Sequence, residues 1–185
     1  MKNKLILGWF VAALLAGCDY KVRLVDKPEL PIDKALMGLW ERTMPQENAD
    51  RFLVLPLSGN EYLVAWPAGA ANALYARACL CKETEFALVQ LTWFGSGEGT
   101  EIGVEDARFY QYAAYSLDGD KLTVRLLNAD AVDRDADTPA ALLAAIKANN
   151  ANPELFREEQ IYTRVKPPAD ANQPFKRPPI PKAWQ

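Results

Sequence analysis

The sequence predicts a mainly β protein, an antiparallel meander that forms a barrel or half-barrel, with one late α-helix before the final strand. Short runs rich in β-branched and aromatic residues follow one another, separated by glycine, asparagine and aspartate. One later segment has its apolar residues at helical spacing, and a last β-prone run follows it. With 185 residues, 50% of them hydrophobic, the chain is long enough for one domain with a substantial core.

The strands are expected in hairpins. Asn60 follows Ser58 and Gly59 in the first expected turn, whereas Asp118-Gly119 supplies the positive φ that a tight turn requires in the last hairpin. Pro56 lacks a backbone donor, so its part of the strand is expected at an edge or a bulge. The β-prone segments are RFLVLPLSGNEYLVAW (51–66), ALYARACLC (73–81), TEFALVQLTWF (84–94), RFYQYAAYSLDGDKLTVRLLN (108–128) and REEQIYTRV (157–165).

One helix is expected just before the last strand. Thr138 is a suitable N-cap, and Pro139 fits the first helical position because its missing N–H would have no partner there. Leu142, Leu143 and Ile146 form an apolar stripe, which is expected to pack on the sheet.

The N-terminus has the pattern of a targeting segment, residues 1–17. Lys2 and Lys4 precede an apolar run of residues 5–15 that is shorter than the roughly 20 apolar residues of a bilayer-spanning helix. Leu15-Ala16-Gly17-Cys18 resembles the lipobox of bacterial lipoprotein precursors. The resemblance implies that the signal is cut before Cys18 and that this residue carries a covalent lipid, such as palmitate. No cofactor is expected besides this lipid. A plain secretory signal or a single anchoring helix is the alternative.

Asp19 follows the expected lipid site directly. In lipoproteins of enterobacterial type, an aspartate here resembles the sorting signal for the inner membrane, and the alternative is an ordinary polar residue. The resemblance thus implies a location in the cell envelope facing the periplasm, with the inner membrane favoured over the outer.

Composition divides the rest of the chain into three parts and excludes one class of partner. Residues 18–31 are expected to be a lipidated tether, 32–166 the β domain, and 167–185 a proline-rich flexible tail. The tail is either disordered or a docking segment for a partner. The formal net charge is −3, and loss of the two signal lysines makes the mature chain still more acidic. This acidity argues against nucleic acid as a partner.

Gly38-Leu39-Trp40 precedes the first strand and resembles the Gly-x-Trp motif of the lipocalins. That family places an arginine of the last strand against the tryptophan, which here implies Arg164. A guanidinium over an indole face contributes about 0.5–2 kcal/mol. The resemblance implies a lipocalin-like barrel plugged by Gly38, Trp40 and Arg164, and the chain is also similar to small lipocalin-like envelope lipoproteins of Gram-negative bacteria, a family that implies no activity. The alternative is an ordinary core tryptophan and a surface arginine.

Cys79 and Cys81 are the next candidates for chemistry. Residues two apart on a strand share one face with Cα atoms about 6.7 Å apart, at the limit of a disulfide. The pair is either a disulfide, two small buried side chains, or a redox or metal-binding couple. With no histidine in the chain, two thiolates do not complete a structural zinc site.

Acidic segments give no metal prediction. The glycine-rich loop at 95–106 has no lysine and no Walker ending, so it is expected to be a solvated connection rather than a phosphate cradle. Asp133, Asp135 and Asp137 imitate the start of an EF-hand, but Thr138 and Ala144 stand where glycine and glutamate belong.

The sequence favours a nonenzymatic binding module over an enzyme. The absence of histidine excludes the usual hydrolase triads, and nothing places two carboxylates across a cleft. The expected partners are the membrane through the lipid and either an apolar small molecule or an envelope protein. A structural adaptor acting through the tail and a sheet edge, and a thiol redox factor using Cys79 and Cys81, are the alternatives. The aromatic residues expected to line a ligand cavity, unless they are simply core, are Tyr62, Trp66, Tyr110, Tyr112 and Tyr115.

Overall fold

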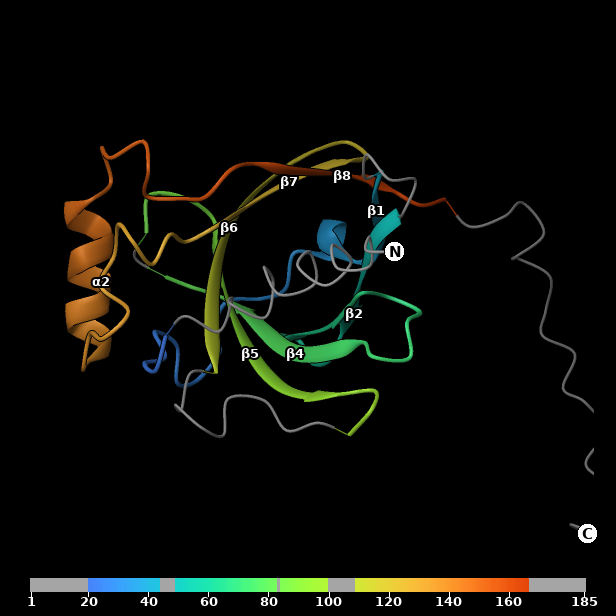
Figure 1. Ribbon diagram of the computed structural model, residues 1–185, viewed down its shortest axis with the longest axis horizontal. Coiled ribbons are helices and arrows are strands. Elements are labelled where there is room, and N and C mark those ends of the chain that lie inside the picture. The colour runs from blue at the N-terminus through green and yellow to red at the C-terminus, as the bar shows by residue number, and fades with distance from the viewer. Residues whose placement is uncertain (1–19, 44–48, 83, 100–108, 167–185) are drawn as a thin grey trace, which may run out of the picture.

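The structure is a computed structural model that describes residues 20–43, 49–82, 84–99 and 109–166. Each strand pairs in antiparallel fashion with the next in sequence, and β1 also pairs with β8, so the sheet closes into a barrel (Figure 1). The predicted mainly β meander with a late helix is confirmed. The strands are β1 (Gly38–Thr43), β2 (Ala49–Pro56), β3 (Tyr62–Trp66), β4 (Leu74–Leu80), β5 (Leu88–Ser96), β6 (Tyr110–Asp118), β7 (Lys121–Leu126) and β8 (Gln160–Arg164).

The hairpin turns follow the turn residues of the sequence. Gly119 has a φ of +57° between β6 and β7, a conformation that glycine adopts at little cost. Between β2 and β3, the backbone N–H of Leu57 donates to the carbonyl of Glu61. Pro56 is the last residue of β2, so its missing donor falls at a strand end, as its chemistry requires.

Strand register sorts the wall into an inner and an outer set of side chains. Trp40 of β1 lies opposite Phe52 of β2 and Arg164 of β8, and directly paired residues share a face. The inner set forms one apolar cluster, to which the 3-10 helix η1 (Lys34–Leu36) contributes the buried Leu36. The barrel interior is therefore lined mainly by apolar and aromatic side chains.

A second apolar cluster lies outside the barrel, against its wall. Helix α2 (Pro139–Ala148) stands beside the barrel in Figure 1 and buries Leu142 and Ile146, each at most 1% exposed. Its N-cap is Thr138, whose side chain accepts a hydrogen bond from the Ala141 N–H, as the sequence predicts. The wall contributes Tyr112, which is fully buried. Within the described part of the chain, no helix is both long and apolar enough to cross a membrane.

The first and last strands are joined by a stacked pair. The Arg164 guanidinium carbon lies 4.2 Å from the centroid of the Trp40 ring, and Trp40 is fully buried. The Trp40 indole N–H donates to the carbonyl of Leu36 at 2.9 Å, and Arg164 donates to the carbonyl of Met37. Gly38 has a φ of +134°, and a Cβ there would lie 2.9 Å from an Arg164 nitrogen. Glycine at this position therefore lets the arginine approach.

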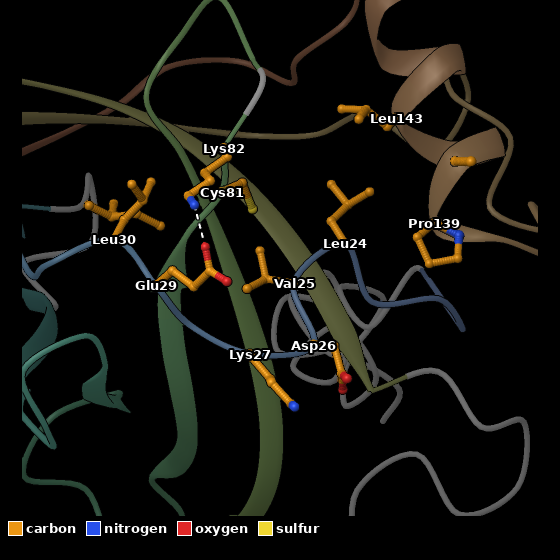
Figure 2. Close-up of a pocket in the computed structure, with 12 residues that line it drawn as sticks. Leu24, Val25, Asp26, Lys27, Glu29, Leu30, Cys81, Lys82, Pro139 and Leu143 are labelled. Carbon is orange, nitrogen blue, oxygen red and sulfur yellow. Dashed lines mark hydrogen bonds and ion pairs between the residues drawn. The ribbon is translucent and has the colours of Figure 1, made fainter.

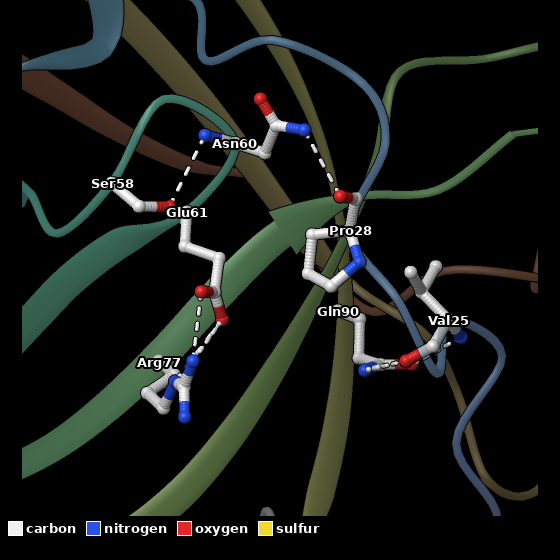
Figure 3. Close-up of polar contacts among 7 residues, drawn as sticks. All are labelled: Val25, Pro28, Ser58, Asn60, Glu61, Arg77 and Gln90. Atoms are coloured by element: carbon white, nitrogen blue, oxygen red, sulfur yellow. Dashed lines mark hydrogen bonds and ion pairs between the residues drawn. The ribbon is translucent and has the colours of Figure 1, made fainter.

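The segment expected to be a free tether is docked on the barrel from Tyr20 onward, which corrects that expectation. We call residues 20–31 the N-terminal strap. Tyr20 is 1% exposed and forms a β-bridge with Tyr110. The buried Gln90 side chain accepts from the N–H of Val25 at 2.9 Å and donates to its carbonyl at 3.1 Å (Figure 3). Backbone groups of the strap therefore form hydrogen bonds with side chains of the outer wall instead of with water.

Further along the strap, a side chain of the β2–β3 hairpin supplies a hydrogen-bond partner for the strap backbone. Asn60 donates from its side chain to the carbonyl of Pro28 at 3.0 Å, and Figure 3 shows this contact beside the ion pair of Arg77 with Glu61. The strap is thus part of the domain rather than a spacer in front of it.

We predict that Arg164→Met lowers the free energy of unfolding by about 2–4 kcal/mol, because it removes the stacking on Trp40 and the charged hydrogen bonds to backbone carbonyls. Urea denaturation followed by tryptophan fluorescence measures the change. Arg51→Met is the control, since it breaks only an exposed ion pair with Glu41 and should cost less than about 1 kcal/mol. Equal effects of the two substitutions would contradict the role given to Arg164.

Candidate functional site

The five aromatic residues expected to line one cavity lie on two faces of the wall, which corrects that expectation. By register, Tyr62, Trp66 and Tyr115 face the barrel interior. Tyr110 and Tyr112 face outward, and the Tyr112 hydroxyl donates to the carbonyl of Val22 in the strap. The outward pair supports the strap and α2 and is not available to a ligand inside the barrel.

The interior lining is apolar and incompletely covered. Val64, Val89, Leu91, Tyr115 and Val124 face inward, yet each is only partly buried. By contrast, the large residues of the outer cluster beside α2 are almost fully covered. Since a protein interior is normally close-packed, the exposed part of these side chains is apolar surface that their neighbours leave uncovered. The interior therefore offers apolar surface to a small molecule.

One polar cluster interrupts this lining, and its centre is Asp50 at the start of β2. Its Oδ1 accepts from the Trp66 indole N–H at 2.6 Å, and its Oδ2 accepts from the Tyr162 hydroxyl at 2.8 Å and from Arg42 Nη2 at 2.9 Å. The Asp50 side chain is 9% exposed. Three donors thus stabilise one nearly buried carboxylate, the arrangement that a buried charge requires. We call Arg42, Asp50, Trp66 and Tyr162 the inner polar cluster.

Arg42 supplies the positive charge of the cluster. Its guanidinium carbon lies 5.3 Å from the centroid of the Tyr162 ring, and its Nε is buried without a hydrogen-bond partner among the described residues. Burial, followed by the charge of Asp50, raises the pKa of Tyr162 well above its ordinary value, so this hydroxyl keeps its proton and remains a donor. The cluster is a fixed array of donors around one ion pair.

The two cysteines are free thiols on the outer side of the wall. Burial raises the pKa of Cys79 to about 11 and that of Cys81 to about 12. Neither thiol carries the depressed pKa of a reactive cysteine. The arrangement is that of two small buried side chains, and it does not contain the disulfide that the sequence left open.

A surface pocket of about 270 Å3 lies between the strap, the end of β4 and α2 (Figure 2). Leu24 and Val25 line it on one side, Cys81 on another, and an ion pair of Lys82 with Glu29 crosses it. Ligand sites typically occupy roughly 300–1,000 Å3 and are mostly enclosed. The pocket is therefore a seam between packed elements, and it brings no converging polar groups to the thiol.

The other residues considered for metal binding stay apart. Asp133 accepts from the backbone N–H of Asp135 at 2.9 Å, a local turn before α2. Across the part of the chain that the structure describes, no three histidine, cysteine, aspartate or glutamate side chains lie close enough to hold a metal ion. Glu101, Glu105 and Asp106 of the glycine-rich loop fall outside that part.

Cys18 and Asp19, together with the signal segment and the tail at 167–185, also lie outside the described residues. The lipid anchor and the sorting signal therefore stay predictions. No family model, curated protein or solved structure matches the chain significantly.

The inner polar cluster was missed by sequence reasoning. Arg42 lies two residues after Trp40, so strand alternation alone puts both on the inner face. Asp50 lies on the next strand, and its position opposite Arg42 depends on register. An arginine two residues after the tryptophan of the Gly-x-Trp motif was the available signal.

We predict that native Cys79 and Cys81 react with iodoacetamide much more slowly than the same thiols in the unfolded chain. At about pH 8, a thiol with a pKa of about 11, as in Cys79, holds about 100-fold less thiolate than one with the ordinary value, and the pKa of about 12 for Cys81 leaves about 1,000-fold less. Burial slows access further. Peptide mass spectrometry after timed labelling, with and without guanidinium, gives both rates. Rapid labelling of the folded protein, or a disulfide that forms readily in air, would revive the redox hypothesis.

Proposed function

We propose that the protein is a nonenzymatic binding module, an envelope lipoprotein whose barrel takes up an apolar small molecule. The observation that carries the proposal is the incompletely covered apolar lining of the barrel. The inward-facing Val64, Leu91 and Val124 keep part of their surface exposed, beside fully buried members of the same cluster such as Trp40. Covering this surface with a ligand is favourable by about 25 cal/mol per Å2 of apolar area removed from water.

The closed barrel favours ligand uptake over the adaptor hypothesis. An adaptor that adds a strand to the sheet needs a free edge. In the described strands, β1 pairs with both β2 and β8, so pairing runs around the barrel without a break. An envelope protein would have to bind by side chains or by the tail.

The proposed anchor acts at very short range. Tyr20 is fixed on the wall, and only Asp19 lies between it and Cys18, so the distance is two residue steps. Two extended residues span about 7 Å. A lipid on Cys18 would therefore hold the barrel directly against the membrane surface, where an apolar ligand can be exchanged with the bilayer.

We predict that the purified protein binds N-phenylnaphthylamine, an uncharged apolar dye whose fluorescence rises in apolar surroundings, and that Leu91→Trp weakens this binding at least tenfold. Leu91 faces inward opposite Ala78, so the larger side chain takes up interior volume that a ligand would need. Ile161→Trp is the control, because Ile161 is 43% exposed on the outer face and the same change there leaves the interior unaltered. Equal binding by the wild type and Leu91→Trp would remove the interior as the binding place.

We also predict that cells supplied with an alkyne analogue of palmitate label the wild-type protein and fail to label Cys18→Ser. The thiol of Cys18 forms the lipid linkage in lipoproteins with the motif seen here, and serine cannot replace it. Cys81→Ser is the matched control and should be labelled like the wild type. Labelling of Cys18→Ser, or none of the wild type, would exclude the anchor without affecting the ligand proposal.

A further inference from the structure

We propose that the ligand is a neutral single-chain amphiphile, whose ester or hydroxyl oxygen binds Arg42 while its hydrocarbon chain lies along the apolar lining. The inference rests on the proposed function and specifies the ligand class for the same interior. It is carried by the inner polar cluster, which is a group of ordered donors around one ion pair in a mainly apolar barrel.

The cluster occupies one part of a mainly apolar wall. Its four members come from β8, β1, β2 and β3, which are neighbours in the sheet. The partly buried apolar side chains come from these strands as well as from the others: Phe52 and Val64 lie on β2 and β3, and Leu91 lies on β5. A ligand inside the barrel therefore meets one polar group within an apolar lining, which matches a polar head on a hydrocarbon chain.

Arg42 is the group that can recognise the head. Among the described residues it donates through Nη2 alone, to Asp50, while Nε is buried without a partner. Its side chain is 23% exposed, so Arg42 is not fully enclosed by the described residues. Leaving a buried donor unpaired is unfavourable, and natural structures rarely keep one without a reason. An oxygen that reaches the guanidinium gives this arginine the acceptor that the protein does not supply.

The charge of the cluster selects an uncharged head. Asp50 already neutralises Arg42, and its two oxygens are taken by Arg42, Trp66 and Tyr162. Arg164, the other inward-facing cation of this half, is engaged by backbone carbonyls and by Asp120. A carboxylate beside Arg42 would bring a second negative charge close to Asp50 in a poorly solvated space. A neutral acceptor binds without this repulsion.

Competition against N-phenylnaphthylamine tests the inference with two probes of equal chain length, monolauroylglycerol and laurate, at about pH 8, where laurate is ionised. We expect the wild type to bind monolauroylglycerol at least tenfold more tightly than laurate. Arg42→Met should lower the affinity for monolauroylglycerol at least tenfold, yet change dye binding less than twofold. The dye lacks an acceptor oxygen, so unchanged dye binding reports an intact interior.

Asp50→Asn tests the charge argument in the opposite direction. This substitution keeps the shape of the side chain but leaves Arg42 unneutralised, and it should shift the preference toward laurate at least tenfold. Arg51→Met is the control for arginine loss, because Arg51 lies next to Asp50 on the outer face and should leave both affinities unchanged.

The outcomes separate the two proposals. If the dye does not bind the wild type, the proposed function is wrong and the inference falls with it. If the dye binds but laurate binds as tightly as monolauroylglycerol, or if Arg42→Met and Asp50→Asn leave the preference unchanged, then the head-group inference alone is overturned.

Discussion

The contact of Arg164 with Trp40 is the interaction on which the rest of the structure depends, because it joins the two ends of the sheet. β1 and β8 pair directly at these two residues, and the Arg164 guanidinium and the Trp40 ring stack inside the barrel where the two strands meet. Gly38 leaves room for the arginine, and η1 provides acceptors for both side chains. A sheet of this kind without closure would expose strand edges and could not enclose a ligand.

A second apolar cluster packs outside the barrel wall, so the barrel interior is not the only core of the fold. The outer cluster under α2 joins Tyr112 of the wall to Tyr20 of the strap and Leu142 of the helix. Those three side chains come from distant parts of the sequence, so the strap and helix are held to the barrel by one buried cluster. The inside of the wall adds a second buried cluster that includes Trp40 and Tyr62, beside partly exposed apolar side chains and the polar cluster around Asp50.

The sequence predicted what local patterns determine, namely the Gly119 turn and the helix capped by Thr138. It placed Trp40 before the first strand, whereas this residue lies within β1. It did not predict that the polar strap docks, because the partner of its backbone is Gln90, which lies more than 60 residues away. Tyr112 and Tyr115 are three residues apart on β6, so strand alternation puts them on opposite faces of the sheet. No local pattern says which of the two faces is the interior. The pairing of Arg42 with Asp50 likewise depends on the register between β1 and β2.

The central claim is that the barrel interior is a binding site rather than a filled core. Native mass spectrometry of the protein purified from membranes without denaturation tests it most directly, with Leu91→Trp prepared in parallel. The account predicts a noncovalent adduct with the mass of a neutral single-chain lipid on the wild type and the bare mass for the variant. A bare wild-type mass that persists after incubation with lipid extract, or an adduct that the variant retains in full, would contradict it.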